Sequence, residues 1–489
     1  MTRLLPHDLP GLHGGQYRPL APADVDRIAD AAFTLLERGG VAVYSQQARE
    51  AFAAAGAEVD EASCTVRLPR ALVEDAIESN PSSITLHGRD GGVDCVLEEN
   101  RVHYGTGGTA IYVLDPDTGQ RRPSETRDVI LNARMVEALR HIHLFTINVY
   151  PNDISDAATV DVNRFFHAFD HTRKHVMGGI YSLEGCQNVV KMAQEIAGGA
   201  EALRAAPFLS FITLIISPLK IDGKYGDMTC YCAREGLPVV VPTEPICGTT
   251  SPVTLAANVL LHTAETLAGI AMVQCINKGA PGICGSVGSI TNNQTMDHVG
   301  GAIERGMLNA AVAQMAQHFK LPLYSTGGTT DAKSVEVQAA YESAMSSLLV
   351  AMSGANYIHD IAGLMETDLT VAYDKLVLDN EILGMCQRVL RGIEVDDKTL
   401  ALDLMIDKGP NVDYLGERHT RRYMRKEFYQ PELASRDKRE QMGPDGTAGE
   451  RARAAVARMR VAPAESLLDP AVRSRLIETF PEIKQAASA

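Results

Sequence analysis

The sequence alternates short apolar runs with longer helical ones from about residue 103 to residue 391, and this regular alternation limits the folds that the chain can adopt. Eight strands are predicted, at residues 102–104 (with 111–114 as the alternative), 144–150, 175–181, 208–217, 238–244, 279–285, 322–326 and 356–361. A helix is predicted after each, at residues 126–141, 157–172, 184–198, 222–235, 253–277, 297–319, 335–353 and 374–391. Eight strands each followed by a helix predict an α/β fold, the (β/α)8 barrel.

An open doubly wound sheet is the alternative fold. It is disfavoured because no G-x-G-x-x-G opens a helix after an early strand, and the glycine-rich G-T-G-G-T at Gly105 is followed by a hairpin pattern. The barrel is predicted to occupy residues 101–395. Residues 1–100 are expected to form an N-terminal helical and β cap, and residues 396–489 a C-terminal helical extension.

Composition and charge exclude several classes of partner. The chain has 489 residues and a formal net charge of −15, which argues against nucleic acid and anionic membrane and permits a neutral or cationic small substrate. No secretory signal is visible, and the apolar stretch 253–277 carries Asn258, His262 and Glu265, so a packed helix is expected there. Nine dispersed cysteines, with a C-x-C at Cys230 and no second ligand pair, predict reduced thiols in the cytoplasm and no bound metal.

The site is expected where the barrel strands end, because catalytic loops gather at that face of a parallel barrel. Tyrosine rings and carboxylates at these ends suit a quaternary ammonium group, which has no N–H to donate. The residues predicted to bind substrate are Tyr104, Asn148, Tyr181, Thr326, Gly327, Gly328, Gln338 and Asp360.

Three residues are predicted to be catalytic: Glu244, His359 and Asp331. Glu244 ends an apolar strand, which suits a counter-charge or base. His359 and Asp360 are neighbours in a strand, so alternation predicts that only one faces the barrel interior. Lys333 could form a Schiff base, although an ion pair with Asp331 at the next helix start is the other interpretation. No H-E-x-x-H, P-loop or G-x-S-x-G occurs.

Several segments together resemble the trimethylamine methyltransferase family: G-T-G-G-T near Gly105, V-P-T-E-P-I-C-G-T-T-S-P-V-T-L-A around Glu244, Y-S-T-G-G-T-T-D-A-K, and S-G-A-N-Y-I-H-D-I-A-G. The resemblance implies a TIM barrel that moves a methyl group from a methylated amine to the cobalt of a separate small corrinoid protein. The trimethylamine enzymes of that family carry pyrrolysine in the barrel, whereas this chain has only standard residues. We place the replaced position near Gly327 and Gly328.

The resemblance therefore points to the branch without pyrrolysine, whose members use quaternary amines. It implies glycine betaine as substrate and dimethylglycine as product, with trimethylamine, proline betaine or carnitine as alternatives. His359 is the first candidate to bind the betaine carboxylate. A homo-oligomer is expected. Two other functions stay open: a Schiff-base lyase or aldolase that uses Lys333, and a non-catalytic barrel that docks a corrinoid partner.

Overall fold

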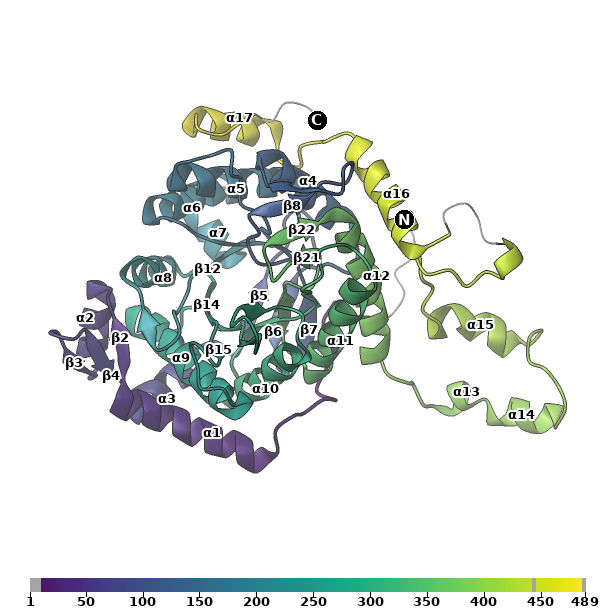
Figure 1. Ribbon diagram of the computed structural model, residues 1–489, viewed down its shortest axis with the longest axis horizontal. Coiled ribbons are helices and arrows are strands. Elements are labelled where there is room, and N and C mark those ends of the chain that lie inside the picture. The colour runs from purple at the N-terminus through teal and green to yellow at the C-terminus, as the bar shows by residue number, and fades with distance from the viewer. Residues whose placement is uncertain (1–9, 442–445, 486–489) are drawn as a thin grey trace.

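A closed parallel barrel forms the centre of the molecule (Figure 1). The computed structural model describes residues 10–441 and 446–485. Its barrel strands are β7 (Arg101–Tyr104), β10 (Phe145–Thr146), β11 (Val176–Gly179), β12 (Leu209–Ile212), β14 (Val239–Thr243), β16 (Gly282–Ser286), β19 (Leu323–Thr326) and β20 (Tyr357–His359). Neighbouring strands pair in parallel, and a parallel bridge between Gly105 and Leu144 closes the ring. The predicted barrel is confirmed, with β7 rather than residues 111–114 as its first strand.

Helices surround the barrel on its outer side, as the sequence predicts. They are α4 (Thr126–Ala138), α5 (Ala157–His171), α6 (Leu183–Ala197), α8 (Gly223–Glu235), α9 (Leu255–Ile276), α10 (Ile303–Phe319), α11 (Val337–Ser353) and α12 (Tyr373–Leu390). A further helix, α7 (Ala200–Ala205), was not predicted, and it follows two glycines with positive φ that end α6. Several strands are shorter than predicted because the chain leaves the ladder to build the loops at the mouth.

Side chains of the barrel strands and of an N-terminal hairpin fill the barrel interior. Tyr324 and Tyr357 pack there with apolar residues of β11, β14 and β16. The hairpin of β5 (Ser83–Leu86) and β6 (Cys95–Glu98) inserts Ile84 and Leu97 into the same cluster. Because this hairpin belongs to the segment before the first barrel strand, it closes the end of the barrel opposite the mouth.

The rest of the N-terminal segment packs against the outside of the barrel (Figure 1). It holds α1 (Pro22–Thr34), the π-helical turn Leu35–Gly39, α2 (Gln46–Ala54), α3 (Arg70–Ser79) and the strands β1 (Leu12–His13), β2 (Val41–Val43), β3 (Glu58–Asp60) and β4 (Thr65–Arg67). Strand β2 also pairs with β13 (Lys220–Ile221), and α1, α2 and α3 all pack on α9. Helix α9 is long and apolar enough to cross a membrane, but 83% of its most apolar window is buried inside the protein, which is typical of a core helix.

Short strands build the rim of the mouth. The predicted hairpin after β7 is present as β8 (Tyr112–Leu114) and β9 (Arg121–Pro123), and it pairs with β22 (Thr370–Ala372), which follows β21 (Leu364–Met365). A second group consists of β15 (Ile246–Cys247), β17 (Ser289–Thr291) and β18 (His298–Val299). The first group joins the loops that follow β7 and β20. The second group joins the loops that follow β14 and β16.

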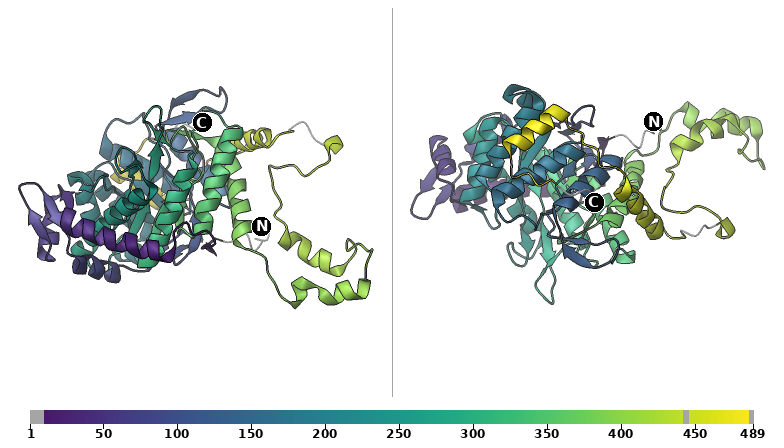
Figure 2. Two further views of the ribbon diagram at one scale, coloured as in Figure 1. Left: turned by 60° about the horizontal axis from the view of Figure 1, so that its bottom comes forward. Right: turned by 90° about the horizontal axis from the view of Figure 1, so that it is seen from above.

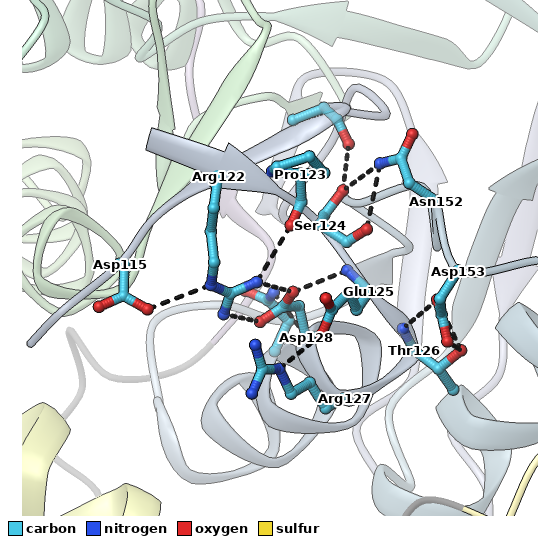
Figure 3. Close-up of polar contacts among 12 residues, drawn as sticks. Asp115, Arg122, Pro123, Ser124, Glu125, Thr126, Arg127, Asp128, Asn152 and Asp153 are labelled. Carbon is cyan, nitrogen blue, oxygen red and sulfur yellow. Dashed lines mark hydrogen bonds and ion pairs between the residues drawn. The ribbon is translucent and has the colours of Figure 1, made fainter. Parts of the chain in front are cut away.

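A polar network fixes the β8–β9 hairpin, which follows β7, to helix α4 (Figure 3). Arg122 donates two hydrogen bonds of 2.8 Å to Asp128 and one of 3.1 Å to Asp115. Asp128 also accepts the backbone N–H of Glu125 in a capping box and the hydroxyl of Tyr373. The loop is therefore tied to two helices, α4 and α12, at once.

The C-terminal part of the chain leaves the barrel and returns to it. Its helices are α13 (Asp397–Leu400), α14 (Leu402–Lys408), α15 (Arg418–Glu427), a 3-10 turn at Arg439–Gln441, α16 (Ala448–Val461) and α17 (Pro470–Thr479). Helix α16 packs on α4 and α12, and α17 packs on α6. Helices α13 to α15 instead project away from the barrel (Figures 1 and 2).

The glycine pair after β19 is packed into the structure rather than open to the mouth. The Gly328 carbonyl accepts hydrogen bonds from Lys375 Nζ at 3.0 Å and from Ser343 Oγ at 2.8 Å. Gly328 has φ +76°, and a Cβ there would lie 2.6 Å from Ile361 Cα. Gly327 has an ordinary φ, and its Cβ would meet Ile358 Cγ2 at 3.2 Å, a tight side-chain contact rather than a backbone clash. Only the second glycine is required by the backbone.

We expect Gly328→Ala to lower the free energy of unfolding by at least about 2 kcal/mol, because left-handed strain adds to a backbone clash. Gly327→Ala is the matched control and should cost less than about 1 kcal/mol. Thermal and denaturant unfolding followed by circular dichroism would measure both. Equal loss in the two variants would contradict this account of the loop.

Candidate active site

Three carboxylates surround one buried arginine at the mouth of the barrel. Arg305 on α10 is 2% exposed at its side chain and donates to Asp368 at 2.8 Å and to Thr329 Oγ1 at 2.9 Å. Its other terminal nitrogen lies 3.8 Å from Asp360 Oδ2. Burial opposes the guanidinium charge, but Asp368, Asp360 and Glu244 together hold the pKa of Arg305 above its usual value. The cluster contains three carboxylates and one permanent cation.

Glu244 is the member of this cluster that faces the open mouth. It directly follows β14, and its side chain retains 40% exposure even though protein atoms surround most of the carboxyl group. This desolvation, with Asp368 and Asp360 nearby, outweighs Arg305 and raises the pKa of Glu244 to about 7. His298 Nε2 lies 3.7 Å from Glu244 Oε1, and burial next to Arg305 lowers the pKa of His298 to about 4. Near neutral pH, Glu244 therefore titrates while His298 is neutral.

His359 and Asp360 both point into the mouth, so the prediction that only one does so is wrong. The His359 ring stacks on Tyr324, with centroids 3.7 Å apart, and its Nε2 lies 2.6 Å from Thr326 Oγ1. Strand β20 ends at His359, and Asp360 has φ +59°, which breaks the strand alternation. Asp360 Oδ1 consequently lies 2.8 Å from His359 Nδ1.

Several polar atoms of this cluster are buried without a hydrogen-bond partner in the described part of the chain. They are His298 Nε2, Arg305 Nε and Nη2, and Asp368 Oδ1. Buried polar groups are normally satisfied by protein or ordered water, and a group of exceptions in one place indicates a ligand or solvent site. The mouth is therefore built to receive a polar or charged guest.

A second group of side chains lies at the ends of β10 and β11, across the barrel from β16 and β19. Arg164 on α5 is buried there, donates to the carbonyls of Gly179 at 2.9 Å and Ile147 at 3.1 Å, and lies 5.0 Å above the Tyr181 ring. Tyr150 contacts the same ring edge-on, with centroids 5.2 Å apart. No salt bridge joins Arg164 to a carboxylate within residues 10–441 and 446–485. Asp161, also on α5, accepts the Tyr181 backbone N–H at 3.1 Å, and burial raises the pKa of Asp161 to about 7 although Arg164 lies nearby. The predicted Tyr181 thus belongs to an aromatic side of the mouth that holds one permanent cation.

Two predicted substrate-binding residues lie away from the mouth. Tyr104 stacks on His143 in the apolar layer between strands and helices, because alternation along β7 turns the neighbouring His103 inward. Asn148 is buried and donates to Asn132 Oδ1 on α4 at 3.1 Å. The structure does not bring either residue to the acidic cluster.

Three further candidates hold the loop after β19. Asp331 accepts the backbone N–H groups of Gly300 and Gly301 at 2.8 and 3.0 Å. Gln338 donates to Glu342, a carboxylate that accepts the Asp331 backbone N–H at 3.0 Å. Lys333 is exposed, and its ammonium donates to the Asp331 carbonyl rather than forming the predicted ion pair. These contacts position the loop, and Asp331 binds backbone groups of Gly300 and Gly301.

Arg305, His298, Asp368 and Arg164 were missed from the sequence. Arg164 lies inside an apolar stretch of α5, where an unexplained arginine is itself a signal of a buried charge site, whereas Arg305 lies in the first turn of α10 beside Glu304 and gives no such signal. His298 begins the short rim strand β18 and Asp368 lies in the turn between β21 and β22, and no spacing rule places either residue beside Glu244. No group of three or more His, Cys, Asp or Glu residues within the described ranges has an arrangement that could hold a metal ion.

Comparison with known proteins agrees with the motifs at the mouth. A family model described as trimethylamine methyltransferase matches residues 7–487. A trimethylamine methyltransferase of Desulfitobacterium hafniense is 35% identical over 84% of this chain and 83% of its own length. A glycine betaine methyltransferase of the same species is 30% identical over 86% of this chain and 87% of its own length. The crystal structure of the monomethylamine methyltransferase of Methanosarcina barkeri aligns with a TM-score of 0.45 and 14% identity, covering 91% and 95% of the two chains.

We predict that a cation binds the mouth more tightly as pH rises from 6 to 8, because Glu244 ionises in this interval. For a pKa of about 7, the ionised fraction rises about tenfold between these values. Titration calorimetry with tetramethylammonium should show this increase in the native chain and lose it in Glu244→Gln. Asp297→Asn, which removes an exposed carboxylate from the same rim, should keep it. An affinity independent of pH in the native chain would contradict the role given to Glu244.

Proposed function

The chain belongs to the trimethylamine methyltransferase family and is a methyltransferase of methylated amines, and we propose that its substrate is a quaternary amine that also carries a carboxylate, glycine betaine above all. The methyl acceptor in this proposal is the corrinoid of a separate protein, and dimethylglycine is the product. The observation that carries the proposal is the excess of carboxylates over permanent cations around Arg305.

The acidic cluster suits a fixed positive charge. Glu244, Asp360 and Asp368 attract a cation, and the stacked rings of Tyr324 and His359 present an aromatic face beside them. A quaternary nitrogen needs no hydrogen-bond acceptor, so electrostatic attraction and ring faces are sufficient to hold it. Arg305 offsets part of the negative charge, which limits how strongly the ground-state cation is held.

Loss of the methyl group from a quaternary amine requires no proton. The C–N bond breaks with both electrons staying on nitrogen, so the leaving group is a neutral tertiary amine. The residues of the mouth then have to place the N-methyl carbon and exclude water. The nitrogen loses its charge during transfer, so the carboxylates hold the product less strongly than the substrate.

Arg164 is our candidate partner for the substrate carboxylate. It provides a permanent positive charge across the barrel from the acidic cluster, and its Nε has no hydrogen-bond partner among the residues that the structure describes. His359, the candidate favoured by the sequence, is close to Thr326 and Asp360 and lies on the acidic side, which repels a carboxylate. The two sides of the mouth together match a zwitterion.

The rim of the mouth supports a protein partner that brings the acceptor. Exposed apolar residues occur in four different strand-to-helix connections around it, namely Ile111, Val253, Met296 and Leu369, and Val337 begins helix α11 after a fifth. Exposed apolar rims are typical of protein interaction sites. A corrinoid held by such a partner would supply the nucleophile that accepts the methyl group, while Glu244 remains accessible from that side.

A panel of donors tests the substrate. With Co(I) cobalamin under reducing conditions, we expect glycine betaine to be demethylated and trimethylamine to give at most a few per cent of that rate. Visible absorbance follows the corrinoid, and mass spectrometry identifies dimethylglycine. Methyl transfer from trimethylamine but not from betaine would contradict the proposed substrate. Borohydride trapping of a Lys333 adduct with a carbonyl compound would instead support the lyase alternative.

Arg164→Lys should lower kcat/KM for glycine betaine at least tenfold while changing that for tetramethylammonium much less, because lysine has no second donor to replace the unpaired Nε–H while its ammonium binds the backbone carbonyls. The ratio of the two substrates separates carboxylate recognition from a general loss of folded protein. Arg127→Lys, an exposed arginine on α4, is the matched control and should leave the ratio unchanged. An unchanged ratio in Arg164→Lys would exclude Arg164 as the carboxylate partner.

A further inference from the structure

The segment from Ile393 to Phe428, here called the arm, projects from the barrel and exposes an unusual amount of apolar surface (Figures 1 and 2). None of its three helices contains a buried residue, and none packs extensively on another described element. The exposed large apolar side chains of the arm are Ile393, Val395, Leu400, Leu402, Met405, Ile406, Val412, Tyr414, Leu415, Met424 and Phe428.

Such an arm is not expected to be stable on its own in water. Its helices have 4, 7 and 10 residues, and isolated helices shorter than about 12 residues are marginal without packing. Contiguous exposed apolar surface of this kind marks an interaction site. We propose that the arm packs against a second copy of this chain, on the outer face of α11 and α12.

The same chain offers a matching apolar face. Tyr341 and Met345 lie four residues apart on α11, and Met385 and Val389 lie four residues apart on α12; all four side chains are exposed. The two helices pack side by side. Helix α12 ends at Leu390 and Gly392 has φ +69°, so the arm begins at Ile393 just after the end of the helix that carries this face.

Charge also favours a second copy. Helix α15 carries five arginine and lysine residues against one glutamate, whereas the whole chain has a net charge of −15. No ion pair is formed by Arg418, Arg421, Arg422, Arg425 or Lys426 within the described ranges. A strongly acidic copy of the same protein is a suitable partner for this helix. The acidic residues Asp396, Asp397, Asp403 and Asp407 on the other arm helices disfavour an anionic membrane.

The position of the arm separates it from the proposed corrinoid partner. Barrel helices run antiparallel to the strands, so the C-terminal end of α12, from which the arm starts, lies at the end of the barrel opposite the mouth. A partner that covers the mouth therefore does not need the arm. Two copies related by a two-fold axis can each place an arm on the face of the other, which gives a closed dimer with two equivalent contacts.

Light scattering after size exclusion, performed on the full chain, tests the proposal. We expect the native protein to be a dimer or a multiple of a dimer at micromolar concentration. Ile406→Glu with Leu415→Glu should raise the dissociation constant at least about a hundredfold, with the thermal midpoint of the monomer's barrel retained. Val461→Glu changes an equally exposed residue outside the arm and the face, and it should leave the assembly intact.

A mixing experiment identifies the receptor surface. Tyr341→Glu with Met345→Glu should also give monomers, and mixing this face variant with the arm variant should restore partial association through the one arm and one face that remain intact. A native protein that is monomeric, or an assembly insensitive to the arm variant, would overturn the proposal. Association of the native arm with anionic vesicles, or loss of corrinoid methylation without loss of assembly in the arm variant, would also overturn it.

Discussion

The buried guanidinium of Arg305 organises the mouth of this barrel. A permanent charge with almost no exposure needs anionic partners. Asp360 and Asp368 supply them from the connection after β20, and Glu244 from the connection after β14. The left-handed backbone at Asp360 has a reason in this arrangement, because it turns the carboxylate toward both Arg305 and His359. Loop positions that are far apart in sequence are thereby held in one geometry.

The perturbed pKa of Glu244 links the fold to the proposed substrate. Desolvation of the carboxyl is the main reason that ionisation is costly, and Asp368 and Asp360 add to this cost while Arg305 offsets part of it. A quaternary ammonium group would remove that cost without requiring a hydrogen bond. Arg164 provides a positive charge on the other side of the barrel. The negative charge of the acidic cluster and the positive charge of Arg164 therefore lie on opposite sides of the mouth.

The barrel could be predicted from sequence because its signal is periodic, with apolar strands and helices repeating in order. The site could be predicted only in part. Glu244 and His359 were found because they directly follow or end apolar strands, whereas Tyr104 was misplaced by the same reasoning, since alternation turns it outward. Arg305, His298 and Asp368 depend on tertiary contacts between α10 and two separate loops, which no local pattern records. The glycine pair was predicted to bind substrate, whereas Gly328 is required by its positive φ and by its packing on Ile361.

The central claim is that the mouth recognises the positive charge of the substrate nitrogen. The most direct measurement compares glycine betaine with 3,3-dimethylbutanoate, which has the same shape and carboxylate but a carbon in place of the nitrogen. Titration calorimetry at pH 8 should give a dissociation constant for betaine at least about tenfold lower, corresponding to one close charge interaction of about 1.4 kcal/mol. Equal affinity for the two compounds would contradict the account.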